Sequence, residues 1–286
     1  MPSLVGLVVW AVALAILPAP LAAGILLLAP LVIVPRFLAM VPERRWVAQL
    51  AGWPALLAAL PLLIAFGLPP GPLAAAFALP WLALALSGAL AAVLHGLARL
   101  PSILGPGRWG DLGIDVALAF WTVGATFLII DRLGIDTGFS SAIVLLTAIH
   151  FHFAGLGLLG LASLMARSRP WLRGPVAGLV VGIPITAAGF VLVSDPIGAV
   201  GAVLVGLSGI AVGVGLLTVA TEGTARLATQ LAGAALLIGM PMGIAWSVAI
   251  LTGQTFVDLD TMIRTHGVLN ATAVLLGVAA YRDEKA

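Results

Sequence analysis

The sequence contains no cysteine and few charged residues. Without cysteine, the chain has no disulfide, no thiolate metal ligand and no cysteine nucleophile. Charged residues make up 8% of the 286 residues, whereas a soluble globular domain carries roughly 25%. Because so little charge cannot cover a water-facing surface of this size, we expect the chain to be surrounded by hydrocarbon.

Long apolar runs take the place of the missing charge. Hydrophobic residues make up 62% of the chain, and the mean hydropathy is +1.21. The runs are continuous rather than alternating, which indicates helices, and a helix satisfies its own backbone hydrogen bonds in lipid. The sequence therefore predicts an all-α, polytopic transmembrane helical bundle. Each span needs about 20 residues, so residues 1–286 hold about ten spans in a single transmembrane domain, with no soluble domain.

Proline, glycine and isolated charges separate the predicted helices. The first is about 15 residues long, against the usual ~20; if it does not span, nine spans remain and the N-terminus changes side. No basic residue precedes it, so we interpret it as a retained helix and not as a signal peptide. The predicted ranges are Ser3–Leu17, Leu21–Met40, Trp46–Leu68, Leu73–Leu97, Leu112–Ile130, Phe139–Ala166, Gly174–Val193, Ile197–Ala220, Leu227–Leu251 and Asp260–Tyr281.

The basic residues gather in alternate loops and in the C-terminal tail. By the positive-inside rule this asymmetry places both termini in the cytoplasm. The net charge of +2, spread over helix ends, does not indicate nucleic-acid binding. The basic set is Arg44, Arg45, Arg99, Arg108, Arg167, Arg169, Arg173, Arg226, Arg282 and Lys285, and the opposite loops contain mainly Asp131, Arg132, Asp136, Asp195, Asp258 and Asp260.

Small residues recur four positions apart in two of the predicted spans. Gly178 and Gly182 form one such pair, and Gly209 and Gly213 form another. Small residues allow transmembrane helices to approach closely, so these positions predict helix packing.

Ionisable side chains inside spans are the candidates for function, because each is costly in a bilayer and usually faces the bundle interior. His150 and His152 lie near the middle of one predicted span. His266 lies two turns into the last span and shares a helix face with Asn270. Asp131 closes the predicted helix 112–130. We expect His266 and at least one of His150 and His152 to line one cavity in the outer half of the membrane.

Two further ionisable residues, His95 and Asp115, lie near the cytoplasmic ends of their predicted helices. In helix 112–130, the residues Trp121, Gly124 and Leu128 form one stripe with Asp131 that is predicted to line a cavity.

The two neighbouring histidines point in different directions. Positions i and i+2 of a regular helix lie about 200° apart, so His150 and His152 cannot chelate one ion together. Either one faces the site while the other bonds elsewhere, or the helix is distorted near Gly155. A metal site needs three or four ligands; His150, His152 and His266 are candidates, but no metal-binding motif is present. The sequence therefore indicates neither whether a metal is bound nor which cofactor, if any, the protein uses.

Two segments resemble a known family. The run AIHFHFAG from Ala148 to Gly155, with THGVLNA from Thr265 to Ala271, resembles the YndJ-like family of bacterial polytopic membrane proteins. The resemblance implies a multi-pass protein of the bacterial inner membrane and a common site of His150, His152, His266 and Asn270. Family members are often labelled transporters, but the resemblance implies no established substrate or mechanism.

Three classes of function remain open. One is a small-solute or proton-coupled transporter, with the histidines as coupling groups. Another is an intramembrane enzyme that acts on a lipid or isoprenoid-like substrate by acid–base chemistry, with Asp131 orienting a histidine. The third is a structural subunit of a larger complex. The expected partners are the lipid bilayer and a small molecule or lipid, and the transporter is favoured by the family label.

Overall fold

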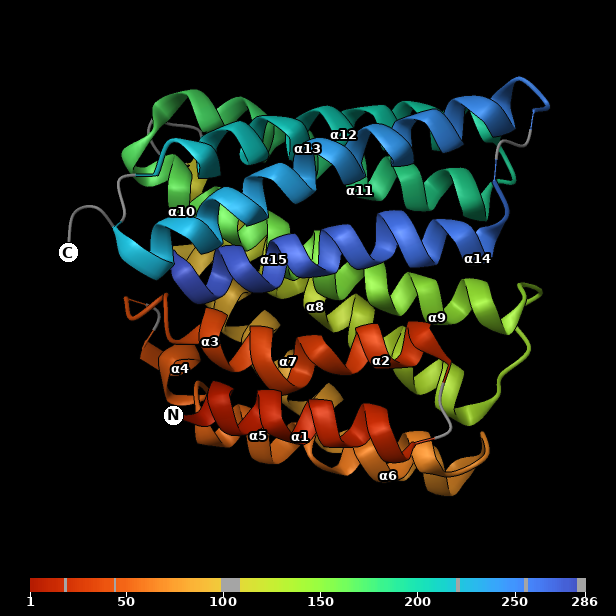
Figure 1. Cartoon of the computed structure of the whole chain (residues 1–286). Helices are drawn as coiled ribbons and strands as arrows, with labels where there is room; N and C mark the ends of the chain where they lie inside the picture. The colour runs from red at the N-terminus through yellow and green to blue at the C-terminus, as the bar shows by residue number, and fades with distance from the viewer. Residues whose placement is uncertain (18–19, 44, 99–108, 220–221, 255–256, 282–286) are drawn as a thin grey trace. The chain divides into compact units, whose positions relative to one another are not determined.

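The computed structural model describes residues 1–17, 20–43, 45–98, 109–219, 222–254 and 257–281, and all regular structure within these ranges is helical (Figure 1). The predicted all-α class is confirmed. Among the described residues, eight helices are long and apolar enough to cross a membrane: Leu21–Leu38, Pro72–Ala98, Gly110–Leu133, Ser141–Ser168, Pro170–Val191, Asp195–Leu217, Gly223–Leu251 and Leu259–Ala280. The chain is therefore a multi-pass integral membrane protein.

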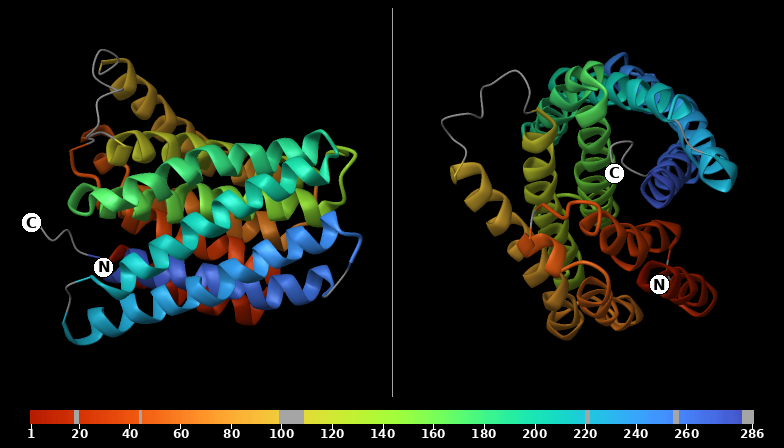
Figure 2. Two further views of the ribbon diagram at one scale, coloured as in Figure 1. Left: turned by 90° about the horizontal axis from the view of Figure 1, so that it is seen from above. Right: turned by 90° about the vertical axis from the view of Figure 1, so that its left-hand side faces the viewer.

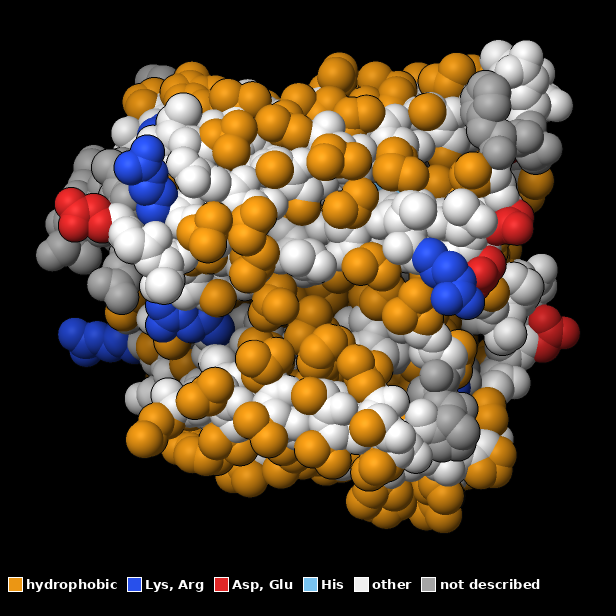
Figure 3. Space-filling view, viewed as in Figure 1, with side chains coloured by type: hydrophobic (Ala, Val, Ile, Leu, Met, Phe, Trp, Pro, Cys, Tyr) orange, Lys and Arg blue, Asp and Glu red, His pale blue; other side chains and the backbone are white. Residues whose placement is uncertain are grey.

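Two shorter apolar helices, Pro2–Ile16 and Trp53–Gly67, occupy the other two predicted spans. The count of ten spans and the cytoplasmic termini stay predictions, and Arg44, Arg99, Arg108, Arg282 and Lys285 lie outside the described residues. Hydrophobic side chains cover much of the visible helix surfaces, whereas charged side chains are found near helix ends (Figure 3). This distribution matches helices whose long faces meet lipid.

The chain divides into two compact units. Unit 1 comprises Met1–Ser102 and Asp115–Gly157, and unit 2 comprises Ile103–Ile114 and Leu158–Ala286. The single transmembrane domain stays a prediction, and each unit is described by itself. The helices of unit 1 are α1 (Pro2–Ile16), α2 (Leu21–Leu28), the π-helical η1 (Ala29–Ile33), α3 (Val34–Leu38), α4 (Arg45–Gln49), α5 (Trp53–Ala59), α6 (Pro61–Gly67), α7 (Pro72–Ala98), most of α8 (Trp109–Leu133), α9 (Ser141–His150) and most of the π-helical η3 (Phe151–Leu158).

The span α2–η1–α3 forms the core of unit 1. Leu26, Leu31 and Val34 are fully buried, and α1, α5 and α9 pack against the span. The α1 helix approaches closely at Gly6, where a Cβ atom would overlap the carbonyl oxygen of Leu31. The absence of a side chain at Gly6 therefore allows the contact.

The predicted continuous helix Trp46–Leu68 is wrong, because the chain turns between α4 and α5. Gly52 adopts φ 69° at this turn, a conformation that glycine reaches without a steric penalty. Pro54 then stands in the first turn of α5, where its missing N–H costs nothing. A second difference concerns α8, which continues past Asp131 to Leu133 and ends before Gly134, whose φ is also 69°.

Unit 2 contains α10 (Leu159–Ser168), the 3₁₀ turn η4 (Pro170–Leu172), α11 (Arg173–Val191), α12 (Asp195–Leu217), α13 (Gly223–Leu251), α14 (Leu259–Met262), the π-helical η5 (Ile263–Gly267) and α15 (Val268–Ala280). The helices α11, α12 and α13 pack side by side in chain order, and α15 packs on α13 (Figure 2).

Glycines bring the helices of unit 2 close together. A Cβ at Gly182 would lie 3.0 Å from Leu204 Cβ of α12, and one at Gly209 would lie 2.7 Å from Met240 Cγ of α13. Gly178 faces Ser208 in the same way. The predicted packing role of these small residues is confirmed.

Candidate functional site

The two neighbouring histidines of unit 1 lie where an α-helix becomes a π-helix. Ser140 caps the start of α9 through its hydroxyl, which accepts the N–H of Ile143 at 3.4 Å. His150 ends α9, and His152 is the second residue of η3, which also contains Gly155. Short π-helical insertions in α-helices are frequently found at functional sites.

His152 is fully buried and both of its ring nitrogens are bonded. Nε2 lies 2.9 Å from Trp81 Nε1, and Nδ1 lies 2.8 Å from the carbonyl oxygen of Ala148. An indole nitrogen can only donate and a carbonyl oxygen can only accept. His152 is therefore the neutral tautomer with its hydrogen on Nδ1, and neither nitrogen has a free position.

The surroundings of His152 are tightly packed. A Cβ at Gly124 of α8 would lie 2.7 Å from Nδ1 of His152. Trp121 packs edge-on against Trp81, with ring centroids 5.2 Å apart. Trp121, Leu128 and Asp131 are all buried. The predicted stripe of α8 therefore packs against other parts of unit 1 at Trp121 and Gly124.

His150 has a different environment. Its side chain is exposed, and Nδ1 lies 2.7 Å from the carbonyl oxygen of Leu146 on the same helix. The carbonyl can only accept, so Nδ1 carries the hydrogen and Nε2 keeps its lone pair. Nε2 has no hydrogen-bond partner among the described residues. His150 thus presents an open basic nitrogen, whereas the neighbouring His152 does not.

Asp131 forms an ion pair with the residue that follows it. Its Oδ2 lies 2.7 Å from a terminal nitrogen of Arg132, and both side chains are largely buried. Arg132 also donates to the carbonyl oxygen of Ala65 at 3.3 Å and lies over the ring of Phe66. These contacts fasten the end of α8 to α6, and the predicted role of Asp131 in orienting a histidine stays a prediction.

In unit 2, His266 and Asn270 do lie together. His266 belongs to η5, and its Nδ1 lies 2.8 Å from the carbonyl oxygen of Gly239 on α13. The amide nitrogen of Asn270 lies 3.0 Å from Nδ1 and 3.2 Å from Nε2 of the ring. A Cβ at Gly243 would lie 2.7 Å from Cε1 of His266. The spacing Gly239, Pro241, Gly243 on α13 is the sequence signal that could have predicted this contact.

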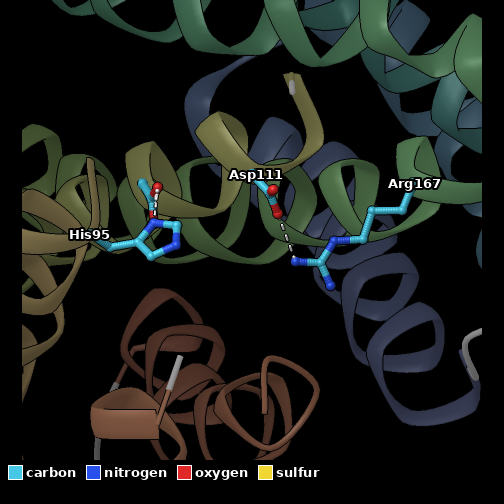
Figure 4. Close-up of polar contacts among 4 residues, drawn as sticks. His95, Asp111 and Arg167 are labelled. Carbon is cyan, nitrogen blue, oxygen red and sulfur yellow. Dashed lines mark hydrogen bonds and ion pairs between the residues drawn. The ribbon is translucent and has the colours of Figure 1, made fainter. Parts of the chain in front are cut away.

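Sequence reasoning also missed one pairing within unit 1. Nδ1 of His95, in the last turn of α7, lies 3.0 Å from Oδ2 of Asp115 on α8 (Figure 4). Both residues were predicted near the same membrane face, and this shared depth was the available signal. Because a carboxylate only accepts, Nδ1 of His95 donates. The bond joins α7 to α8.

A second ion pair lies at one end of the helices of unit 2. Arg167, near the end of α10, reaches Oδ1 of Asp111 in the first turn of α8 at 3.1 Å (Figure 4). Arg169 donates to the carbonyl oxygens of Gly215 and Thr218 at 2.9 and 3.1 Å, where it caps the end of α12. These arginines therefore hold helix ends together.

The site residues belong to different units. His150, His152 and Asp131 are in unit 1, and His266 and Asn270 are in unit 2, so their common cavity stays a prediction. In the parts of the chain that the structure describes, no group of three or more His, Cys, Asp or Glu side chains is arranged to hold a metal ion.

Comparison with known proteins gives one match. No curated protein and no solved structure matches the chain. A family model described as YndJ-like protein matches residues 24–274, a range that includes both histidine-bearing π-helical segments. The resemblance seen in two short runs thus extends over most of the sequence, and the chain belongs to the YndJ-like protein family.

Proposed function

We propose that the protein transports a small solute across the membrane together with protons, and that His150 and His266 are its protonatable groups. The observation that carries this proposal is the exposed ring of His150, whose Nε2 is open in the middle of an apolar span. An imidazole in contact with hydrocarbon is costly, so this ring requires a polar neighbour such as water or a polar solute.

The helix geometry supports a role in movement. Both histidine-bearing spans change from α-helix to π-helix at the histidines, and such segments are frequently found at functional sites. Proline residues also lie inside three helices, Pro80 in α7, Pro184 in α11 and Pro241 in α13. Proline removes a backbone hydrogen bond and bends a helix, which suits a protein whose helices change their relative tilt.

The test is transport by the purified protein in proteoliposomes. Neutral sugars, amino acids, organic anions and organic cations are added in turn, and charge movement is recorded on a solid-supported membrane with and without a proton gradient. One solute class is expected to give a proton-dependent current. The His150→Gln variant should reduce that current to background, because a glutamine side chain can form hydrogen bonds but does not take up a proton near neutral pH.

The matched control is His95→Gln, which removes a histidine that is bonded to Asp115 and leaves a group that can still donate to that carboxylate. Its current per folded molecule should stay at the wild-type level. Absence of a proton-dependent current for every solute class, or full activity of His150→Gln, would overturn the proposal.

A second candidate is an intramembrane enzyme that acts on a lipid or isoprenoid-like substrate. The fixed tautomer of His150 favours it, because a hydrogen held on Nδ1 by Leu146 leaves Nε2 as a ready general base. The enzyme hypothesis predicts that the protein, incubated with lipid in nanodiscs, forms a new lipid product that mass spectrometry detects without any ion gradient. The product should be absent with His150→Gln.

A further inference from the structure

The hydrogen bonds of His266 define where this ring can accept a proton. Nδ1 lies 2.8 Å from the carbonyl oxygen of Gly239. Since that oxygen only accepts, Nδ1 donates and Nε2 is the nitrogen with the lone pair in the neutral ring. A proton taken up by His266 therefore binds to Nε2.

Asn270 stands four residues further along and faces the same ring. Its amide nitrogen lies 3.2 Å from Nε2, and it also lies 3.0 Å from Nδ1. A side-chain amide nitrogen donates, so its acceptor in the neutral ring is the lone pair of Nε2, whereas its 3.0 Å contact with Nδ1 joins two donors and is not a hydrogen bond in this tautomer. The carbonyl oxygen Oδ1 of Asn270, by contrast, is buried and has no hydrogen-bond partner among the described residues. A buried acceptor without a partner is unfavourable, so the pair is incompletely satisfied in this state.

We propose that His266 and Asn270 form the binding site of the coupling proton and that the carboxamide of Asn270 reverses when the proton binds. Nε2 takes a proton from a hydronium ion of the surrounding water: an N–H bond forms at its lone pair, one O–H bond of the hydronium ion breaks, and a water molecule is released. The carboxamide then turns by half a rotation, so that Oδ1 accepts the new Nε2–H while the amide nitrogen faces α13 at Gly239. The coupling role of this proton rests on the proposed transport function, whereas the existence of the proton site does not.

The backbone of α13 leaves room for both orientations. A Cβ at Gly239 would lie 2.7 Å from Oδ1 of Asn270, so the missing side chain makes the space that the carboxamide occupies. In the reversed orientation the amide nitrogen enters this space. The carbonyl oxygen of Gly239 has two lone pairs, so it can accept from the amide as well as from Nδ1 of His266.

Charged groups on the elements packed against η5 are few. On α13 the charged residue is Arg226, in the first turn and far along the helix from Gly239. On α14 it is Asp260, which pairs with Arg264 of η5 at 2.6 Å, and the N-cap residue Asp258 accepts the N–H of Thr261. The helix α15 carries none. Asn270 Oδ1 is thus the buried acceptor without a partner that lies beside the ring.

The test is a titration of the histidine rings by nitrogen NMR. Full-length protein labelled with ¹⁵N-histidine is placed in nanodiscs, and the His266 signals are identified by their loss in His266→Gln. In Asn270→Leu the acceptor is absent, so the titration midpoint of His266 should fall by about one to two pH units. In Asn270→Asp a carboxylate replaces the carboxamide, so the midpoint should rise by at least as much.

His150 provides the internal control, because its signals are recorded in the same samples and should not change. If the two Asn270 variants and the wild type share one His266 midpoint within about 0.3 pH units, the proposal is overturned. The two variants differ in size and charge, so one remains informative where the other does not fold. The titration requires no transport: shifted midpoints without any solute current would keep the proton site and overturn the transport function.

Discussion

The π-helical segments η3 and η5 each carry a histidine, but the two rings have partners of different kinds. His152 in η3 accepts from the indole N–H of Trp81, a group that can only donate. His266 in η5 faces Asn270, whose carboxamide can present a donor or an acceptor. Protonation of His152 would break its bond to Trp81. When His266 is protonated, by contrast, the unused acceptor Oδ1 of Asn270 lies beside its ring. The partner therefore decides whether a histidine within a span can change its charge.

A similar contrast separates the two histidines of one span. His152 is fully buried and saturated, while His150, two residues earlier, is exposed with Nε2 open. Their residue type and depth in the span are nearly the same. What differs is the helix face on which each ring lies and the helices that cover that face.

The largest effect should come from filling the space beside His152. In Gly124→Ala the new Cβ would lie 2.7 Å from Nδ1 of His152 and 3.0 Å from Phe151 Cβ. Two hydrogen bonds hold the His152 ring in place, so it cannot move away from the new Cβ atom. We expect a loss of about 2–3 kcal/mol in the free energy of unfolding, the upper part of the range for overpacked cores, measured by reversible unfolding in mixed micelles.

The control for this variant is Gly96→Ala on α7, where a Cβ would meet nothing within 4 Å. Alanine is the better helix former by about 0.5–1 kcal/mol, so this variant should be neutral or slightly more stable. Equal stability of Gly124→Ala and wild type would show that the His152 ring is mobile, and the contrast with His266 would be lost.

A smaller effect is expected for the bond between Trp81 and His152 alone. A double-mutant cycle of Trp81→Phe and His152→Leu isolates its energy. The average interhelical hydrogen bond in a membrane protein contributes about 0.6 kcal/mol, with a maximum near 1.7. Because both atoms are buried and 2.9 Å apart, the coupling energy should lie near that maximum.

The matched change at the open histidine is His150→Leu. Nδ1 of His150 bonds only within its own helix, so the free energy of unfolding should change by less than about 0.5 kcal/mol, as at other exposed positions. A coupling energy near zero for Trp81 and His152, or a large loss of stability in His150→Leu, would reverse the roles assigned to the two rings.

The smallest effect lies at the start of the last span, outside its apolar part. The backbone N–H of Thr261 donates to Oδ1 of Asp258 at 2.7 Å. This bond is the main cause of a lowered pKa of the Asp258 carboxyl, below its ordinary value of 3.8, and a side-chain hydrogen bond from Thr261 is the next largest cause. A lowered pKa in the folded state means that the cap stabilises α14 above pH 3.8. That stabilisation is lost as the pH falls through the lower, folded-state pKa.

Amide hydrogen exchange at Thr261 measures this local effect. The protection factor of its N–H should fall on acidification in the wild type. In Asp258→Asn, which keeps an acceptor oxygen but has no charge to lose, it should stay constant. Identical pH profiles for the two proteins would contradict the assigned cause. The Asp258→Asn substitution should not alter the titration midpoint of His266, whose partner is Asn270.

Several local features could be predicted from residue patterns because they depend on few neighbours. The apolar runs determine the helices, and the i, i+4 spacing places His266 beside Asn270. The glycine pairs of α11 and α12 also met helix neighbours as predicted. The turn at Gly52 was missed, because a glycine within an apolar run is equally compatible with a continuous membrane helix.

Contacts between spans could not be predicted in the same way. In a soluble protein the polar face of a helix shows which side is exposed, but a membrane helix is apolar on its lipid face and on its packed face. The residue pattern therefore did not identify Trp81 as the partner of His152. The shared depth of His95 and Asp115 and the glycine spacing on α13 were signals that did not single out those two pairings.

By itself, the sequence determined the solvent of this protein and the class of its fold. So little charge and such long apolar runs leave helices in a bilayer as the stable arrangement. The tertiary structure decided the chemistry of each histidine, because the availability of a ring nitrogen depends on the donor or acceptor placed within hydrogen-bond distance by another helix turn. For His150 that leaves an open Nε2, for His152 a saturated ring, and for His266 a partner that can accept as well as donate.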